Sequence, residues 1–134
     1  MNIVYRRKID FTSEQGQSLT EFALALPILA LLLFAVIQFG VAFNNFVTLT
    51  DATRAGARKA AVGRQSPSPA SDCQAAIRSS AKDLTPGSLT TSCTSTWQPG
   101  ADVTVTATYP YKISLLGLVV KTGRLSSTTT ERVE

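Results

Sequence analysis

A continuous apolar block dominates the first half of the chain. From Phe22 to Phe43, every residue except Pro27, Gln38 and Gly40 is apolar. These 22 residues would extend about 33 Å as a helix, which is enough for a bilayer core of about 30 Å. A buried helix that is apolar all round would need more protein around it than this chain offers. The pattern therefore predicts a transmembrane helix, which we assign to residues 17–47.

Two features of this block affect how it is interpreted. Pro27 removes one backbone donor inside the helix, so we expect a kink there, which membrane helices tolerate. The basic residues at 6–8 precede the block, as in a secretory signal peptide, and a cut after Ala42 is the corresponding alternative. The apolar run is too long for a typical signal peptide, so the anchor is favoured.

The helical pattern continues past the apolar block, through residues 48–64. Ala52, Gly56 and Ala60 recur every four residues, so they form a ridge of small side chains along one helix face. Such a ridge allows another backbone to approach closely. The ridge could pack on the chain's own sheet or on a partner, and the sequence leaves both open.

The pattern changes to that of a small α+β domain over residues 65–134. A Pro/Ser-rich linker leads into a short helix at 73–84, for which Ser71 or Asp72 is the expected cap. Alternating apolar residues at 103–109 predict a half-buried strand. With weaker strands around it, they indicate an antiparallel sheet of about three strands, at 89–97, 102–111 and 124–133.

Two details of this sheet stay open in the sequence. Pro110 indicates that the second strand either ends there or lies at a sheet edge. The apolar run Ile113–Val120 is too short to span a membrane. We expect it to fill the core beneath the sheet, and the alternative is an exposed apolar segment that touches lipid or a neighbouring subunit.

Composition narrows the classes of function. The chain has 134 residues, a net charge of +4 and no histidine. It shows no basic patch interleaved with aromatic residues, so nucleic-acid binding is not expected. We find no nucleophile–base pair, paired carboxylates or Gly-rich phosphate loop, and therefore expect no enzyme, catalytic residue, cofactor, metal site or small-molecule substrate.

The two cysteines, Cys73 and Cys93, lack the C-x-x-C spacing of a zinc site. If this region is exported, they are expected to form one disulfide, which closes a loop of about 20 residues and contributes about 3 kcal/mol. The alternative is a pair of free thiols in a cytosolic domain. We favour the disulfide.

Glu21, at the start of the apolar block, allows two interpretations. An acidic residue in the first turn of a helix interacts favourably with the helix dipole, with Ser18 or Thr20 as the cap. Alternatively, the pattern of a basic head, Gly16, four residues, "EF" and a long apolar run resembles the type IV prepilin processing site. This resemblance implies a leader at 1–16, a prepilin peptidase that cuts before Gln17, and a Glu21 carboxylate that pairs with the N-terminal amine of a neighbouring subunit.

The stretches "EFALALPILALLLFAVIQFG" and "TDATRAGARKAA" resemble, more narrowly, the TadE-like minor pilins (pseudopilins) of the tight-adherence (Tad or Flp) pilus. The resemblance implies a structural protein that acts in pilus assembly, initiation or anchoring. It implies as partners membrane lipid, a prepilin peptidase, other pilus subunits and an inner-membrane assembly platform. The alternative function is an unprocessed, single-pass, membrane-anchored binding module.

The same resemblance implies a location in the bacterial inner membrane. The N-terminus would be cytoplasmic and residues 65–134 extracytoplasmic, with entry into an extracellular pilus left open. Three basic residues precede the span and four follow it, so the positive-inside rule does not choose an orientation. The cysteine pair agrees with the orientation of the family.

Overall fold

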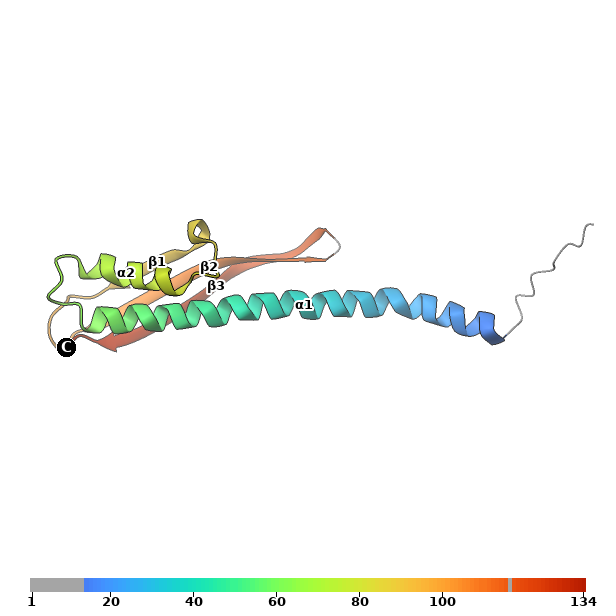
Figure 1. Ribbon diagram of the computed structural model, residues 1–134, viewed down its shortest axis with the longest axis horizontal. Coiled ribbons are helices and arrows are strands. Elements are labelled where there is room, and N and C mark those ends of the chain that lie inside the picture. Colours follow the sequence, from blue (N-terminus) through green and yellow to red (C-terminus); the bar gives the residue numbers. More distant parts are fainter. Residues whose placement is uncertain (1–13, 116) are drawn as a thin grey trace, which may run out of the picture. The chain divides into compact units, whose positions relative to one another are not determined.

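The computed structural model describes residues 14–115 and 117–134 (Figure 1). Its elements, in chain order, are α1 (Glu14–Ala61), α2 (Pro69–Ser80), a 3₁₀ turn η1 (Pro86–Ser88), β1 (Thr90–Thr94), β2 (Asp102–Leu115) and β3 (Leu118–Arg132). This α+β architecture confirms the predicted fold class. Most of the expected leader, residues 1–13, lies outside the described residues. The chain forms two units that divide between Val36 and Ile37, inside α1, and each is described by itself.

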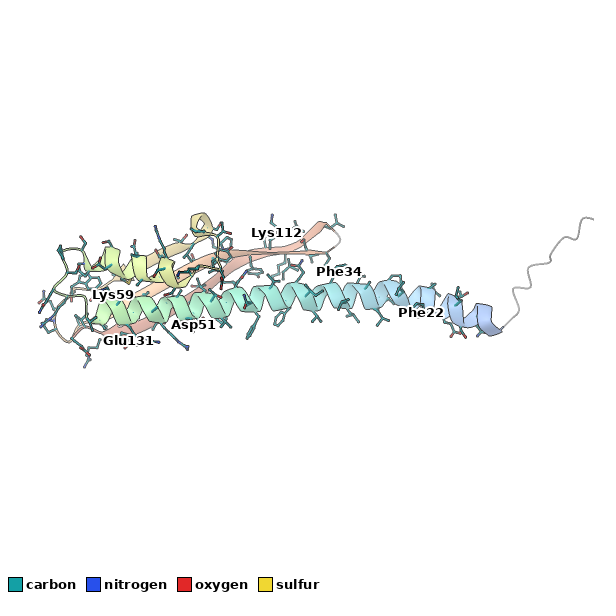
Figure 2. The ribbon with its side chains drawn as sticks, in the orientation of Figure 1. Phe22, Phe34, Asp51, Lys59, Lys112 and Glu131 are labelled. Carbon is teal, nitrogen blue, oxygen red and sulfur yellow. A yellow bond between two sulfur atoms is a disulfide. The ribbon has the colours of Figure 1, made fainter. Side chains whose placement is uncertain are left out.

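The N-terminal unit consists, over its described residues, of the first part of α1. Its large apolar side chains are exposed on all sides, including Phe22 and Phe34 (Figure 2). The helix continues through Pro27 without ending. The described part of this unit has no buried face, because its sequence has no polar stripe to set one face apart from another.

The second unit is built on a three-stranded antiparallel sheet in the order β1-β2-β3. β1 pairs with β2 from Thr90↔Thr108 to Thr94↔Thr104, and β3 pairs with β2 along nearly its whole length. Beyond Thr108, β2 therefore has a partner on one side only. Pro110 lies in this part, where a missing N–H breaks no ladder on the open side. Of the two interpretations of Pro110, the sheet edge is correct and a strand end is wrong.

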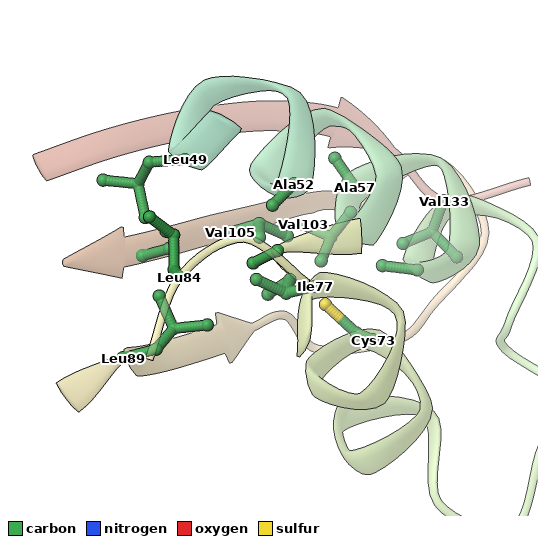
Figure 3. Close-up of a cluster of buried hydrophobic side chains, with 13 residues drawn as sticks. Leu49, Ala52, Ala57, Cys73, Ile77, Leu84, Leu89, Val103, Val105 and Val133 are labelled. Atoms are coloured by element: carbon green, nitrogen blue, oxygen red, sulfur yellow. The ribbon is translucent and has the colours of Figure 1, made fainter. Parts of the chain in front are cut away.

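One face of the sheet carries the core. Val103, Val105 and Ala107 of β2 are fully buried, as their alternation predicts. The C-terminal half of α1 and helix α2 cover this same face, so the unit has two layers (Figure 3). The core is completed by apolar side chains from both helices and the connecting segments: Leu49, Ala52, Ala57, Ala60, Cys73, Ile77, Ala81, Leu84, Leu89 and Val133.

The opposite face of the sheet is polar. Thr104 is exposed, and Thr106 and Thr128 lie 3.1 Å apart, hydroxyl to hydroxyl, across the β2–β3 pair. Threonine suits this position because its branched side chain fits an extended strand and its hydroxyl faces water. The long Thr-rich runs of the sequence are thus explained by strand structure.

Two local expectations are wrong. Helix α2 begins at Pro69, with Ser68 as its N-cap residue, and not after Ser71 or Asp72. Proline is favoured in the first turn because it lacks only an N–H that would have no helical partner there. The expected core role of Ile113–Val120 is also wrong: the segment forms the end of the β2–β3 hairpin, and Leu118, Val119 and Val120 are exposed.

Candidate processing and assembly site

The residues of the proposed processing site lie in the first turns of α1. The Thr20 hydroxyl donates a hydrogen bond to the Gly16 carbonyl at 2.9 Å. The side-chain amide of Gln17 donates to Oε1 of Glu21 at 3.1 Å. All four residues are exposed. The structure therefore places Glu21 one helical turn from residue 17, within reach of a donor on that residue.

The Gly16–Gln17 peptide bond is exposed at a helix start. The first four N–H groups of a helix have no intrahelical acceptor, so the first turn is the easiest part to unwind. α1 begins at Glu14, so Glu21 lies beyond its first turn, and Ser18 and Thr20 lie inside the helix. The expected helix start at Glu21, with Ser18 or Thr20 as the cap, is therefore wrong. The geometry is compatible with the interpretation of Glu21 as an assembly residue.

The helix that follows this site is long and apolar enough to cross a membrane. Among the described residues, Gly16–Ala61 is the one helix with these properties, and none of its most apolar 18-residue stretch is buried in the protein. Water would solvate such a surface poorly. The helix is thus compatible with a single-pass membrane anchor.

The small-residue ridge lies farther along α1, inside the second unit. Ala52 and Ala60 are fully buried, and Gly56 is buried too. A Cβ atom at Gly56 would overlap Cγ1 of Ile77 on α2. Of the two possibilities that the sequence left open, the structure shows packing into the chain's own core, with Gly56 against α2.

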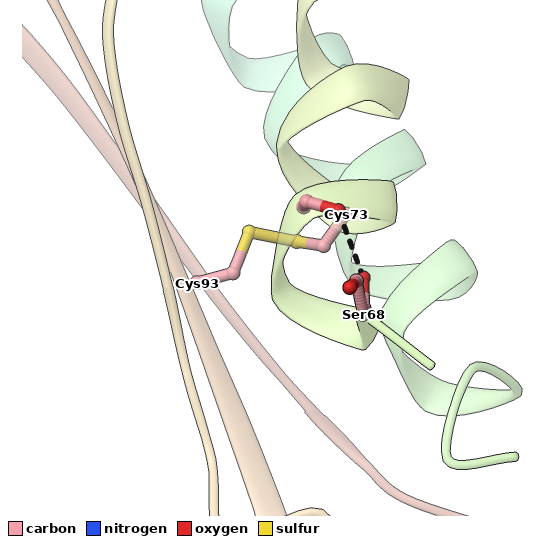
Figure 4. The surroundings of a disulfide bond; sticks show 4 residues. Ser68, Cys73 and Cys93 are labelled. Carbon is pink, nitrogen blue, oxygen red and sulfur yellow. Dashed lines mark hydrogen bonds between the residues drawn. A yellow bond between two sulfur atoms is a disulfide. The ribbon is translucent and has the colours of Figure 1, made fainter. Parts of the chain in front are cut away.

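Cys73 and Cys93 form a disulfide that joins α2 to β1 (Figure 4). Their Cα atoms are 6.4 Å apart, within the usual range for a bridged pair. Cys73 is fully buried, and Cys93 packs against the edge of the core. Of the two possibilities considered for these cysteines, the disulfide is confirmed.

A buried polar link between α1 and β3 was not anticipated from the sequence. Oγ1 of Thr53, which is fully buried, donates to the Thr50 carbonyl at 2.8 Å and lies 3.0 Å from Oγ of Ser127. The Thr129 hydroxyl donates to Thr53 at 3.4 Å. The sequence showed only that β3 is polar on both faces. That pattern does not identify Thr53 as the partner of Ser127, because the two residues are 74 positions apart.

An apolar groove lies between α1 and the β2–β3 hairpin, also within the second unit. Its volume is about 410 Å³, and its walls include Phe39, Phe43 and Phe46 of α1 and Tyr111 and Leu125 of the hairpin. Within residues 14–115 and 117–134, no group of three or more His, Cys, Asp or Glu side chains is arranged to hold a metal ion. The walls of this groove thus suit an apolar ligand or surface better than a metal ion.

Comparison with known proteins bears on the first of these sites. Residues 16–58 match the family model described as "TadE-like protein". The matched segment begins at Gly16 and covers Glu21, the apolar helix and most of the small-residue ridge. No curated protein and no protein of solved structure matches the chain. The match confirms the resemblance carried by the N-terminal segment.

Proposed function

We propose that the chain is a minor pilin or pseudopilin of the Tad pilus system, because residues 16–58 match the TadE-like family model. It would be processed by a prepilin peptidase and act as a structural, non-catalytic protein in assembly, initiation or anchoring of the pilus. The observation that carries the proposal is that the family match begins at the glycine before the proposed cut. The exposed apolar helix that follows provides the anchor.

The proposed mechanism begins with cleavage between Gly16 and Gln17, which creates an α-amine at the head of the apolar helix. A carboxylate in or near hydrocarbon costs several kcal/mol unless it is paired. The amine of an incoming subunit would offset this cost for Glu21, and only in the correct axial register. The hydrogen bond from the Gln17 side chain to Glu21 supports the proposal, because it places the carboxylate where it accepts from a donor near the start of the helix.

The proposed orientation places the N-terminus in the cytoplasm and the second unit outside the inner membrane. The disulfide supports this, because disulfides persist in oxidising compartments. The proposed partners are the peptidase, other pilus subunits, the assembly platform of the inner membrane and its lipid. Incorporation into the extracellular fibre would follow from the same helix leaving the bilayer for a helical bundle.

The first test is the N-terminus and intact mass of the protein from host cells with and without the prepilin peptidase. We expect a chain that starts at Gln17 only when the peptidase is present. Gly16→Leu should abolish this cleavage, whereas Gly40→Leu, which changes a glycine with no neighbour within 4 Å of the added Cβ, should not. A chain that still starts at Met1 in the presence of the peptidase would support the unprocessed binding module instead.

The second test separates the charge of Glu21 from its role in cleavage. Glu21→Gln keeps the size and removes the charge, and Glu21→Ala removes both. We expect both variants to be cleaved and to give few pili by electron microscopy. Thr20→Ala removes the neighbouring hydroxyl and its bond to Gly16, and should give normal numbers of pili. Full piliation of the Glu21 variants would show that charge pairing is not needed.

A further inference from the structure

The end of the β2–β3 hairpin projects beyond the rest of the sheet. β1 begins at Thr90, opposite Thr108, and from Tyr109 onward β2 pairs with β3 alone. The strands meet at Leu115↔Leu118, and Gly117 adopts φ of +84°, which suits glycine. We call residues 112–115 and 117–124 the hairpin tip. Leu118, Val119 and Val120 in it are 75%, 55% and 62% exposed.

The exposed apolar residues of the tip point to both faces of the hairpin. Leu118 pairs with Leu115 and Val119 pairs with the adjacent Ser114, so Leu118 and Val119 lie on opposite faces of the hairpin. Val120 is the extra residue of the bulge between the Val119 and Lys121 pairs. A surface that docks on one folded partner would need apolar residues on a single face. Apolar exposure on both faces fits immersion in a medium that surrounds the tip, such as the outer part of a lipid bilayer.

Cationic residues stand directly behind the apolar end. Lys112, Lys121 and Arg124 are exposed, and Lys121 is opposite Ile113 in the ladder. Residues 103–130 contain no Asp or Glu, so the tip carries a charge of +3 without local compensation. The ion pairs found among the described residues, Arg54–Asp51 and Arg132–Asp102, do not involve these three. Long basic side chains behind an apolar end suit anionic lipid phosphates.

The tip lies toward the end of the second unit at which α1 becomes apolar. Thr53 of α1 contacts Ser127 of β3, and the groove then brings Phe39–Phe46 of α1 next to Tyr111 and Leu125. Within the second unit, the part of α1 from Ile37 onward and β3 thus run in the same direction, away from the tip (Figure 1). The apolar surface continues from the helix, through the groove, to the tip.

We propose that the hairpin tip docks on the surface of the anionic phospholipid bilayer in which α1 is anchored. Leu118, Val119 and Val120 enter the interfacial layer, and Lys112, Lys121 and Arg124 contact lipid phosphates. Insertion is shallow, because the outer edges of a two-stranded hairpin have unpaired backbone groups that hydrocarbon cannot satisfy. The inference relies on the proposed function only for the anchor itself.

The test uses the full chain, with its disulfide formed, in vesicles of phosphatidylglycerol and phosphatidylethanolamine. Val119→Cys is labelled with the environment-sensitive fluorophore NBD, and Thr130→Cys, an exposed position on the same strand, is the matched control. We expect lipids with a spin label near the headgroup to quench the fluorophore at 119 at least twofold. The fluorophore at 130 should keep its water-like emission without quenching.

The charge requirement is tested in the same labelled chain. Lys112→Glu with Lys121→Glu should remove most of the quenching at position 119 while leaving the emission of Trp97, which packs against the core, unchanged. Replacing phosphatidylglycerol by phosphatidylcholine should weaken quenching in the wild-type background and have little effect in the double variant.

Three outcomes would overturn the docking. A chain that floats with the vesicles but shows no quenching at 119 keeps its anchor and lacks a docked tip. Blue-shifted emission that is not quenched by lipid and grows with the protein-to-lipid ratio would mean that the tip contacts a second copy. A chain that does not float with the vesicles would overturn the anchor of the proposed function, and the docking with it.

Discussion

At the scale of single residues, Gly56 determines how closely α1 and α2 approach. A Cβ atom there would overlap Ile77 and lie 3.4 Å from the Cys73 carbonyl. Overpacking costs about 1–3 kcal/mol, and the better helix propensity of alanine returns about 1 kcal/mol. We therefore expect Gly56→Ala to lower the stability by about 1 kcal/mol and the Tm by roughly 4–8 °C, followed by Trp97 fluorescence in detergent.

Gly40→Ala is the matched control for this substitution, because its Cβ would meet nothing within 4 Å in the chain. It should leave the melting temperature unchanged or raise it. Equal melting temperatures for both variants would mean that Ile77 moves aside without cost, and that Gly56 is not needed for the contact.

The buried hydroxyl pair of Thr53 and Ser127 is a second feature at this scale. Thr53→Val leaves the largely buried Ser127 hydroxyl without this partner, so we expect a loss of about 1–3 kcal/mol. Thr53→Val with Ser127→Ala removes both polar groups and should cost less than the sum of the single changes. Urea unfolding of the four proteins measures this coupling, and additive losses would mean that the two hydroxyls do not interact.

At the scale of elements, the disulfide connects α2 to the edge strand β1. The bridge spans 20 positions, for which chain entropy gives about 3 kcal/mol of stabilisation. We expect reduction of the wild-type chain to lower its unfolding free energy by about this amount. The double variant Cys73→Ala with Cys93→Ala should have the lower unfolding free energy even without reductant, and adding the reductant should not change it. A reduced wild-type chain as stable as the oxidised one would contradict the expectation.

The elements themselves were largely predictable. The strict alternation from Val103 to Tyr109 identified β2, and the unbroken apolar run identified α1, because both patterns are local. The hairpin tip was not predictable, because apolar residues in a short run look the same whether they fill a core or protrude. The small-residue ridge was visible, yet its partner α2 depended on a tertiary contact between Gly56 and Ile77.

At the scale of the whole molecule, the proposed orientation can be measured directly. Thr96 is exposed in the segment between β1 and β2, so Thr96→Cys should react with a membrane-impermeant maleimide in intact spheroplasts. The wild-type chain provides the control, since both of its cysteines are in the disulfide and should remain unlabelled. Labelling of Thr96→Cys only after lysis would place this unit in the cytoplasm.

The candidate site was also predictable only in part at this scale. Gly16, Glu21 and the apolar run could be identified together because they are close in sequence, and the family match covers this segment. The contact between Thr53 and Ser127 could not be predicted, because a local sequence pattern does not pair residues that are 74 positions apart. Residues beyond 58 lie outside the matched segment, so their arrangement rests on physical packing alone.

If the second unit is exported as proposed, the sheet order β1-β2-β3 has a consequence for how it folds. Each strand pairs with the one that precedes it, and both connections are short, so each pairing can form as soon as the next strand has crossed the membrane. The two cysteines precede β2, and oxidation can therefore close the ring before the hairpin is complete. The pairing of β3 with β2 and the contact of β3 with α1 must wait for the last strand. Translocation from the N-terminal side and folding then proceed in the same direction.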